Sequence, residues 1–311
     1  MEDGKTVDVF PCALVFIDVQ AAGSPNLKSK NPLSYVRQAI CLNKSLLHAG
    51  LPRLNIFTNV SAAVLSQLSD TPAPERPIVH RLDTMMEVPK RARFYAAHFK
   101  LDLLAQATEL LEINSLLLLL DTDMVAFRKL DDNMLRRCGT AGVGVFDISD
   151  QVFPAYGSER VIGDLETVAG RQLANPRWYG GEFLLATKDF LHRLVPRARQ
   201  LYETYVREIG HLDHQGDEIF ISAALNTLAD EGQHIVEVGA YQAVGRHWSG
   251  NTHRDLRWFR GCCFLHLSGA KTLFETESRL PGFDRRRFWR KVVTAHLIGR
   301  LHFAAKHYLK R

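Results

Sequence analysis

Residues 116–125, which read LLLLLDTDMV, decide the fold class. Five consecutive leucines predict a strand that is apolar on both faces, and such strands are typical of parallel sheets covered by helices on both sides. Asp121 and Asp123 follow at once, where the buried part of the strand ends. In open α/β sheets, ligands bind beyond the carboxyl ends of the strands. The stretch therefore predicts an α/β fold with a site after this strand.

The segments around this strand alternate between strand and helix patterns, which indicates an α/β fold with a mostly parallel, mixed sheet flanked by helices. The pattern loosens after residue 139, and residues 150–178 are rich in turn residues. We expect one domain over residues 1–283 and a basic helical appendage over residues 284–311. The predicted strands are 12–19, 53–60, 77–82, 116–125, 142–146, 179–187 and 261–267, and the predicted helices are 33–49, 61–68, 93–111, 188–208, 216–229 and 284–310.

The composition excludes several classes of protein. The 311 residues are 46% hydrophobic and 23% charged, whereas a disordered chain needs low hydrophobicity and high net charge. The five cysteines are scattered without a CxxC pair, so a disulfide framework and a zinc knuckle are disfavoured. The N-terminus lacks the features of a signal peptide, and no apolar run approaches the roughly 20 residues of a bilayer-spanning helix. We expect a cytoplasmic protein.

The basic charge gathers at the C-terminus. Residues 285–311 hold nine Lys and Arg and no Asp or Glu, which leaves 30 basic and 34 acidic residues before them. On a helix, one apolar stripe would carry Trp289, Val293, Leu297, Leu301, Ala304 and Tyr308. A basic amphipathic helix of this kind indicates an anionic membrane surface as its partner. The alternative is a helix that packs its stripe on the domain; nucleic acid is disfavoured because no recognition motif accompanies the charge.

The two aspartates after the leucine run point to a divalent cation. Asp121 and Asp123 can both turn toward one ion, and carboxylate oxygens suit Mg²⁺ or Mn²⁺, which would bridge nucleotide phosphates. His266 lies at the end of the predicted apolar strand 261–267 and is a candidate third ligand. Gly269 would let the backbone approach a phosphate, and Lys271 would neutralise it. The alternative is a strand-end turn with two solvated aspartates.

Four segments in this order resemble nucleotide-sugar glycosyltransferases: LLLLLDTDMV, YGGEFLLAT (179–187), GDEIFISAAL (216–225) and HLSGAKTLF (266–274). The chain is similar over roughly residues 12–275 to enzymes of the Rossmann-like GT-A fold, in particular to glycosyltransferase family 8, which includes lipooligosaccharide galactosyltransferases and glycogenin. The resemblance implies a UDP-sugar donor, retention of the anomeric configuration, and Mn²⁺ (or Mg²⁺) held by Asp121, Asp123 and His266.

The resemblance also implies contacts to the nucleotide. Asp18, with its neighbours Val19 and Gln20, would meet the uracil ring, and Gly269 and Lys271 would meet the diphosphate. Lys100 or Arg93 would take the place of the family's phosphate-binding arginine. The chain departs from the family's usual motifs at three places. Gly180-Gly181-Glu182 replaces the usual Asn-x-Gly, and Asp217-Glu218 replaces the usual Asp-Gln. Lys271 comes one residue earlier than the family's lysine.

Three carboxylates are candidates for the chemistry at the sugar. The anomeric carbon becomes oxocarbenium-like, so a nearby carboxylate can stabilise it or accept the acceptor's proton. Glu182, Asp217 and Glu218 are the candidates, although Asp217 and Glu218 also suit the N-terminus of a helix without any catalytic role. We expect transfer of a hexose to a saccharide or lipid-linked saccharide in surface polysaccharide or glycolipid synthesis, at the cytoplasmic membrane face. An inverting reaction with a carboxylate base is the alternative.

Two other functions remain open. An apolar run followed by Asp-x-Asp-x-Val also resembles the nucleophile strand of haloacid dehalogenase-like phosphatases, with Asp121 as the nucleophile. Three predicted strands precede it here, and Ile221 stands where the later Gly-Asp-x-x-x-Asp motif needs its second aspartate. The departures from the family motifs also fit a nucleotide-sugar-binding subunit without turnover.

Overall fold

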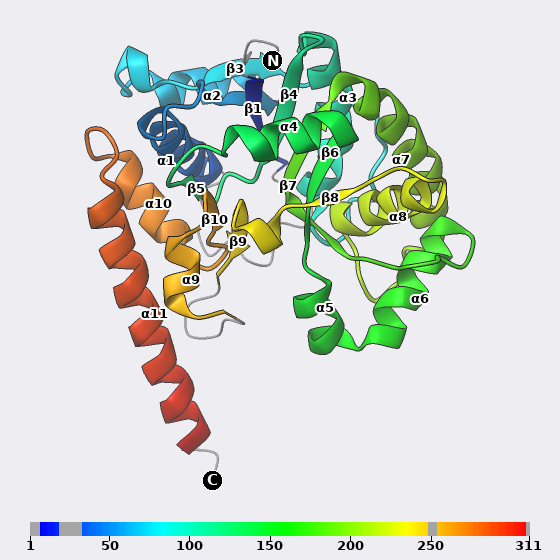
Figure 1. Ribbon diagram of the computed structural model, residues 1–311. Coiled ribbons are helices and arrows are strands. Elements are labelled where there is room, and N and C mark those ends of the chain that lie inside the picture. The colour runs from blue at the N-terminus through cyan, green and yellow to red at the C-terminus, as the bar shows by residue number, and fades with distance from the viewer. Residues whose placement is uncertain (1–6, 19–32, 248–253, 309–311) are drawn as a thin grey trace.

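A seven-stranded sheet forms the centre of the computed structural model, which describes residues 7–18, 33–247 and 254–308 (Figure 1). The strand order is β3-β2-β1-β4-β7-β6-β8, and helices flank the sheet. The strands are β1 (Asp8–Val15), β2 (Asn55–Thr58), β3 (Ile78–Arg81), β4 (Ser115–Leu120), β6 (Val143–Asp147), β7 (Tyr179–Thr187) and β8 (Val236–Glu237). This arrangement confirms the predicted α/β fold.

The leucine strand β4 lies in the middle of this sheet. It pairs in parallel with β1 and antiparallel with β7, so that Leu119 stands opposite both Cys12 and Leu184. Each leucine of the run is at most 2% exposed, because neighbours and helices cover both faces. Strands β1, β2, β3 and β4 are parallel to one another, β6 and β8 are parallel to each other, and β7 runs antiparallel to both β4 and β6. The sheet is therefore mostly parallel and mixed, as predicted.

A second, three-stranded sheet receives the chain directly after β4. Its strands are β5 (Met124–Ala126), β10 (Phe264–His266) and β9 (Val244–Arg246), in the order β5-β10-β9. The prediction of one continuous strand over 116–125 is wrong, because the chain turns at Asp121, whose N–H binds the carbonyl of Glu182. The Met124 N–H then binds the carbonyl of Asp121. This turn places both aspartates between the two sheets.

The helices include several that the sequence analysis did not predict. Two of them fall almost wholly in the turn-rich residues 150–178. In the second of these two helices, buried Val161, Leu165 and Val168 recur at helical spacing between two glycines. The helices are α1 (Ser34–His48), α2 (Ser61–Leu68), α3 (Lys100–Leu110), α4 (Asp132–Ala141), α5 (Ser149–Tyr156), α6 (Ser158–Ala169), α7 (Lys188–Glu208), α8 (Asp217–Asp230), α9 (Leu256–Arg260), α10 (Lys271–Ser278) and α11 (Arg285–Tyr308).

Helix α11 divides into two parts. Phe288 and Val292 of its first half are buried in a small core with Phe274 of α10 and Val125 of β5. Its C-terminal end extends past the body of the protein (Figure 1), and Leu301 is 71% exposed. The face that packs on the domain differs from the predicted apolar stripe: positions 288, 292 and 296 are buried, whereas 297 and 304 are exposed and the side chain of residue 308 lies outside the described part. Within the described residues, no helix has the length and hydrophobicity of a membrane span.

Candidate metal and donor site

Three predicted ligands meet between the two sheets. Asp121 and Asp123 lie in the turn after β4, and His266 ends β10. One ligand atom from each lies within 4.8 Å of the others. The Leu267 N–H binds the carbonyl of Asp123 at 3.0 Å, which fixes the turn against the strand that carries His266. The sequence predicted this set of three residues, and the structure brings them together.

His266 lies between two carboxylates. Its Nε2 is 3.2 Å from Asp123 Oδ1, and its Nδ1 is 3.2 Å from Glu182 Oε1. Burial alone would lower the pKa of His266, but the charges of Asp123 and Glu182 outweigh it and raise that pKa to about 10. Coordination of a metal requires an unprotonated ring nitrogen, so a bound ion would replace the proton on Nε2. The Nδ1–H would then donate to Glu182, which is the usual arrangement around a metal-bound histidine.

The ligand set fits a divalent metal. Burial would raise the pKa of Asp123, but His266 and Lys271 hold that pKa well below its usual range, so the carboxylate is ionised. Lys271 Nζ lies 3.3 Å from Asp123 Oδ2 and 5.1 Å from the centre of the Tyr35 ring. Two carboxylates and one imidazole suit Mn²⁺ or Mg²⁺. Lys271 adds a positive charge at the same edge of the sheet.

Lys100 connects this cluster to helix α8. Its buried Nζ lies 2.8 Å from Asp121 Oδ1 and 2.9 Å from Asp217 Oδ2, and it donates to the carbonyl of Gly181 at 2.9 Å. Burial would lower the pKa of Lys100, but the two aspartates outweigh it and hold that pKa above its usual value. The predicted phosphate-binding lysine is thus fixed by three oxygens between the metal ligands and α8.

Asp217 and Glu218 begin helix α8 beside β7. Burial raises the pKa of Asp217 to about 6, and the charge of Lys100 offsets part of the rise. Space for the Asp217 carboxylate depends on Gly181, because a Cβ there would lie 2.5 Å from Asp217 Oδ2. Gly216, which precedes the helix, has φ of +129° and packs on Phe94. Only glycine adopts this conformation without strain, so the entry to α8 depends on it.

The sequence analysis missed Arg246 and Trp178, which hold the other two candidate carboxylates. Arg246 of β9 donates to both oxygens of Glu182, at 2.7 and 2.6 Å, and to Glu218 Oε1 at 2.8 Å. Trp178 Nε1 donates to Glu218 Oε2 at 2.9 Å. Glu182 is fully buried, and Arg246 and His266 hold its pKa well below the usual range although burial would raise it. No local sequence pattern marks Arg246, because its partners come from strand β7 and helix α8, which are distant in the sequence.

The remaining predicted residues lie nearby without meeting the metal ligands. Asp18, just past β1, forms an ion pair with Lys90, whose Nζ stands 5.0 Å from the centre of the Tyr95 ring. Gly269 lies in the turn between β10 and α10, with open space at the position of a Cβ. The Arg93 N–H donates to Gln215 Oε1 near the start of α8. The predicted neighbours Val19 and Gln20 lie outside the described residues.

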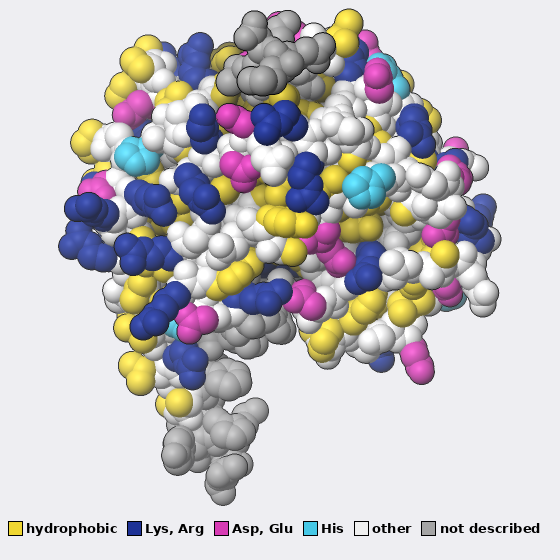
Figure 2. All heavy atoms as spheres, viewed as in Figure 1, with side chains coloured by type: hydrophobic (Ala, Val, Ile, Leu, Met, Phe, Trp, Pro, Cys, Tyr) yellow, Lys and Arg dark blue, Asp and Glu magenta, His cyan; other side chains and the backbone are white. Residues whose placement is uncertain are grey.

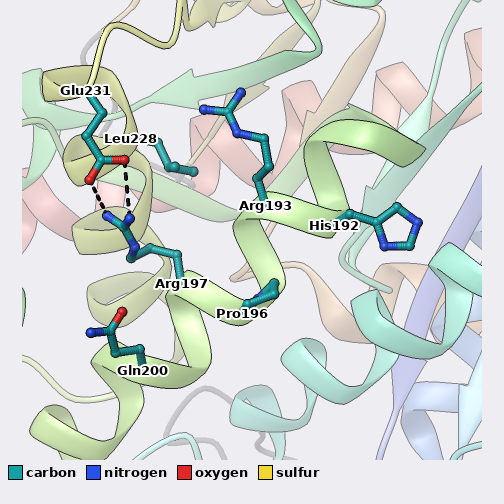
Figure 3. A pocket seen from close by; sticks show the side chains of 7 residues that line it. All are labelled: His192, Arg193, Pro196, Arg197, Gln200, Leu228 and Glu231. Carbon is teal, nitrogen blue, oxygen red and sulfur yellow. Dashed lines mark hydrogen bonds and ion pairs between the residues drawn. The ribbon is translucent and has the colours of Figure 1, made fainter.

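A separate hollow lies on the surface between α7 and α8 (Figure 3). Arg197 spans it with a paired contact to Glu231 at 2.7 and 3.2 Å. None of the residues that line this hollow belongs to the set around the metal ligands. Its two arginines already have partners in Glu231 and Gln233, so it carries no catalytic assignment.

The class of fold follows from these features together with comparison to known structures. No family model matches the chain, and no curated protein sequence matches it either. Among solved structures, the bifunctional glycosyltransferase WbbM in its apo form has a TM-score of 0.56 and 9% identity, over 91% of this chain and 51% of that one. The chain thus spans about half the length of WbbM.

Two structures of the galactosyltransferase LgtC match over nearly their whole length. LgtC in complex with donor and acceptor sugar analogues has a TM-score of 0.52 and 12% identity, over 90% of this chain and 99% of that one. An active-site mutant of LgtC has a TM-score of 0.54 and 13% identity, with the same coverage. The chain shares its fold with these glycosyltransferases, which confirms the predicted GT-A fold.

Proposed function

We propose that the chain is a metal-dependent glycosyltransferase that moves a hexose from a UDP-sugar to a saccharide or lipid-linked saccharide, with retention. One observation carries the proposal: Asp121, Asp123 and His266 converge after the central strand of a GT-A fold, with Lys271 and Lys100 beside them. Ligands bind at this edge in open α/β sheets. The surface polysaccharide or glycolipid pathway is part of the same proposal.

The leaving group defines what the cationic residues do. Charge develops on the β-phosphate of the nucleoside diphosphate as the glycosidic bond breaks. A divalent ion held by Asp121, Asp123 and His266 would stabilise that charge as a Lewis acid. Lys271 adds a fixed positive charge, and the open space at Gly269 lets the backbone approach the diphosphate. We assign Asp18 to contact with the uracil ring, as the resemblance to family 8 implies.

The three carboxylates have different surroundings, which separates their roles. Glu182 is fully buried and bound by Arg246 and His266, so it orients the histidine rather than touching a sugar. Glu218 is 29% exposed in its side chain and accepts from Arg246 and Trp178. Asp217 forms an ion pair with Lys100, and burial raises the pKa of Asp217 to about 6. We assign Asp217 and Glu218 to the sugar side of the site.

We further propose that α11 holds the protein at an anionic membrane surface, on the cytoplasmic face. Figure 2 shows basic and hydrophobic side chains together along the lower left of the molecule, where α11 lies in Figure 1. Leu297, Ile298 and Leu301 are between 49% and 71% exposed on the outer half of the helix. Apolar side chains flanked by Lys and Arg suit the headgroup region of anionic lipids. A lipid-linked acceptor would lie at the same surface.

The experiment is a panel of UDP-sugars incubated with Mn²⁺ and the full chain, with release of UDP as the measurement. We expect slow hydrolysis of one donor that stops with a chelator and in Asp123→Ala, because Asp123 is a ligand. Hydrolysis of a generic phosphomonoester instead would favour the phosphatase with Asp121 as nucleophile. UDP binding with metal but without release from any donor would favour the non-catalytic subunit.

A further inference from the structure

Arg246 joins the two halves of the site. Its guanidinium binds both oxygens of Glu182 and one oxygen of Glu218, all at 2.6 to 2.8 Å, and its side chain is only 10% exposed. On one side, Glu182 contacts the metal ligand His266. On the other, Glu218 lies at the start of α8, among the residues assigned to the sugar. One side chain therefore fixes a carboxylate on each side.

The backbone makes this arrangement rigid. Strands β9 and β10 are parallel neighbours, and Arg246 stands directly opposite His266 in their register. The N–H of the next residue, His247, binds the carbonyl of His266 at 3.0 Å. A paired contact between a planar guanidinium and a carboxylate also fixes the orientation of both groups. Arg246, Glu182 and His266 thus form one continuous, buried chain of contacts.

The contacts to Glu182 depend on the charge of Arg246. Glu182 has no exposed surface, and a buried carboxylate is costly unless a cation and hydrogen bonds compensate it. The guanidinium of Arg246 supplies both the cation and two hydrogen bonds, at 2.7 and 2.6 Å. The carboxylate held in this way lies with Oε1 3.2 Å from His266 Nδ1, so its position fixes the orientation of the imidazole ring.

We propose that Arg246 is a positioning residue: through Glu182 it orients His266 for the metal, and through its second contact it orients Glu218 for the sugar. This inference rests on the proposed function, since it concerns the metal of that site. Glu218 needs such support because its other partners, Trp178 Nε1 and the Gly181 N–H, do not carry charge.

The test measures Mn²⁺ affinity of the full, metal-free chain by calorimetry, without donor or acceptor. We expect Arg246→Met to weaken Mn²⁺ binding by about 10- to 100-fold, the usual loss when support of a metal ligand is removed. Arg246→Lys keeps the charge but not the paired geometry, so it should lie between the wild type and Arg246→Met. Glu218→Gln should keep the wild-type Mn²⁺ affinity and lose turnover.

Arg287→Met is the matched control, because Arg287 binds the similarly buried carboxylate of Glu277, whose ion-pair partners in the described residues are Arg287 and Lys291 and not a metal ligand. It should lower stability and leave Mn²⁺ affinity unchanged, which separates positioning from general destabilisation. Wild-type affinity in Arg246→Lys and Arg246→Met would overturn the inference; should Arg246→Met not fold, Arg246→Lys decides alone. A wild-type chain that binds no Mn²⁺ would instead contradict the metal dependence in the proposed function.

Discussion

Charged side chains gather in two regions of this protein, and the two regions differ in how far these side chains are buried and paired. Around the metal ligands, cations and carboxylates alternate in buried contacts: Lys100 lies between Asp121 and Asp217, and Arg246 lies between Glu182 and Glu218. Residues 285–311, most of which form α11, include nine Lys and Arg and no Asp or Glu, and the described side chains on the outer half of the helix are mostly exposed.

The difference shows how burial determines what a charge does. A buried charge has a specific partner and a fixed position, so its removal leaves the partner uncompensated. An exposed charge acts as part of a field that salt screens within about 10 Å at 0.1 M. Substitutions near the metal ligands should therefore have large, local effects that resist salt. Substitutions on outer α11 should have small effects that add together and weaken with salt.

Lys100→Met should have the largest effect on stability. It removes the ammonium that bridges Asp121 and Asp217 and leaves two carboxylates without their shared cation. Breaking a buried ion pair from one side costs about 3–5 kcal/mol of unfolding free energy. Urea unfolding of the metal-free chain measures this cost.

The control for Lys100 is Arg160→Met, which removes an ion pair to Asp213 whose side chains are 59% and 54% exposed. Such surface pairs contribute about 0–1 kcal/mol. Equal unfolding free energies for the two variants would show that the buried cluster is no more dependent on its charges than the surface is. Adding Asp217→Asn to Lys100→Met should restore part of the loss.

Gly181→Ala tests the geometry of the site without changing a charge. The new Cβ would lie 2.5 Å from Asp217 Oδ2, so the carboxylate must move. A displacement of about 1 Å at a reacting group can lower kcat by about 100-fold. Gly163→Ala in α6 is the matched control, because its Cβ meets no atom within 4 Å. It should leave kcat unchanged and add about 0.5–1 kcal/mol to stability; a normal kcat in both variants would remove Asp217 from the reaction.

The pKa of Asp217 predicts opposite pH trends for activity and stability. Because burial raises that pKa to about 6, the carboxylate gains its proton as the pH falls through 6. kcat/KM should then fall about tenfold per pH unit below 6. The native state binds this proton more tightly than the unfolded chain does, so the unfavourable contribution of ionised Asp217 to stability disappears between about pH 6 and pH 4. Asp217→Asn should remove both trends; an unchanged acidic limb of activity in that variant would assign the limb to another group.

Local patterns in the sequence were sufficient to predict the central sheet and the grouping of Asp121, Asp123 and His266. A short apolar run between other predicted strands indicates a buried strand, and carboxylates directly after it are then expected at the edge of the sheet. The break after Leu120 was not predicted, because apolar residues continue at Met124 and the turn depends on the distant carbonyl of Glu182. Arg246 was missed for the same reason, since its role comes from pairing between β9 and β10.

Helix α11 shows the limit of periodicity. Its basic, amphipathic character was evident, but Phe288 and Trp289 are adjacent and either could start the buried stripe. Contacts with Phe274 of α10 decide for Phe288, and two salt bridges from Arg287 and Lys291 to Glu277 support the same orientation. Sequence spacing does not contain these tertiary contacts, so it predicted the helix but not the face that packs on the domain.

Leu301→Ser should give the smallest effect, and it tests the exposed side of the comparison. Leu301 is 71% exposed, so its replacement should leave the unfolding free energy within about 0.5 kcal/mol. Binding of the full chain to anionic vesicles at low salt should weaken about fivefold, because about 1 kcal/mol of apolar contact with lipid is lost. Ile113→Ser is the control, since Ile113 is 83% exposed in the segment between α3 and β4. If the two variants bind vesicles equally well, or the wild type does not bind them, the charge of outer α11 serves another purpose than membrane attachment.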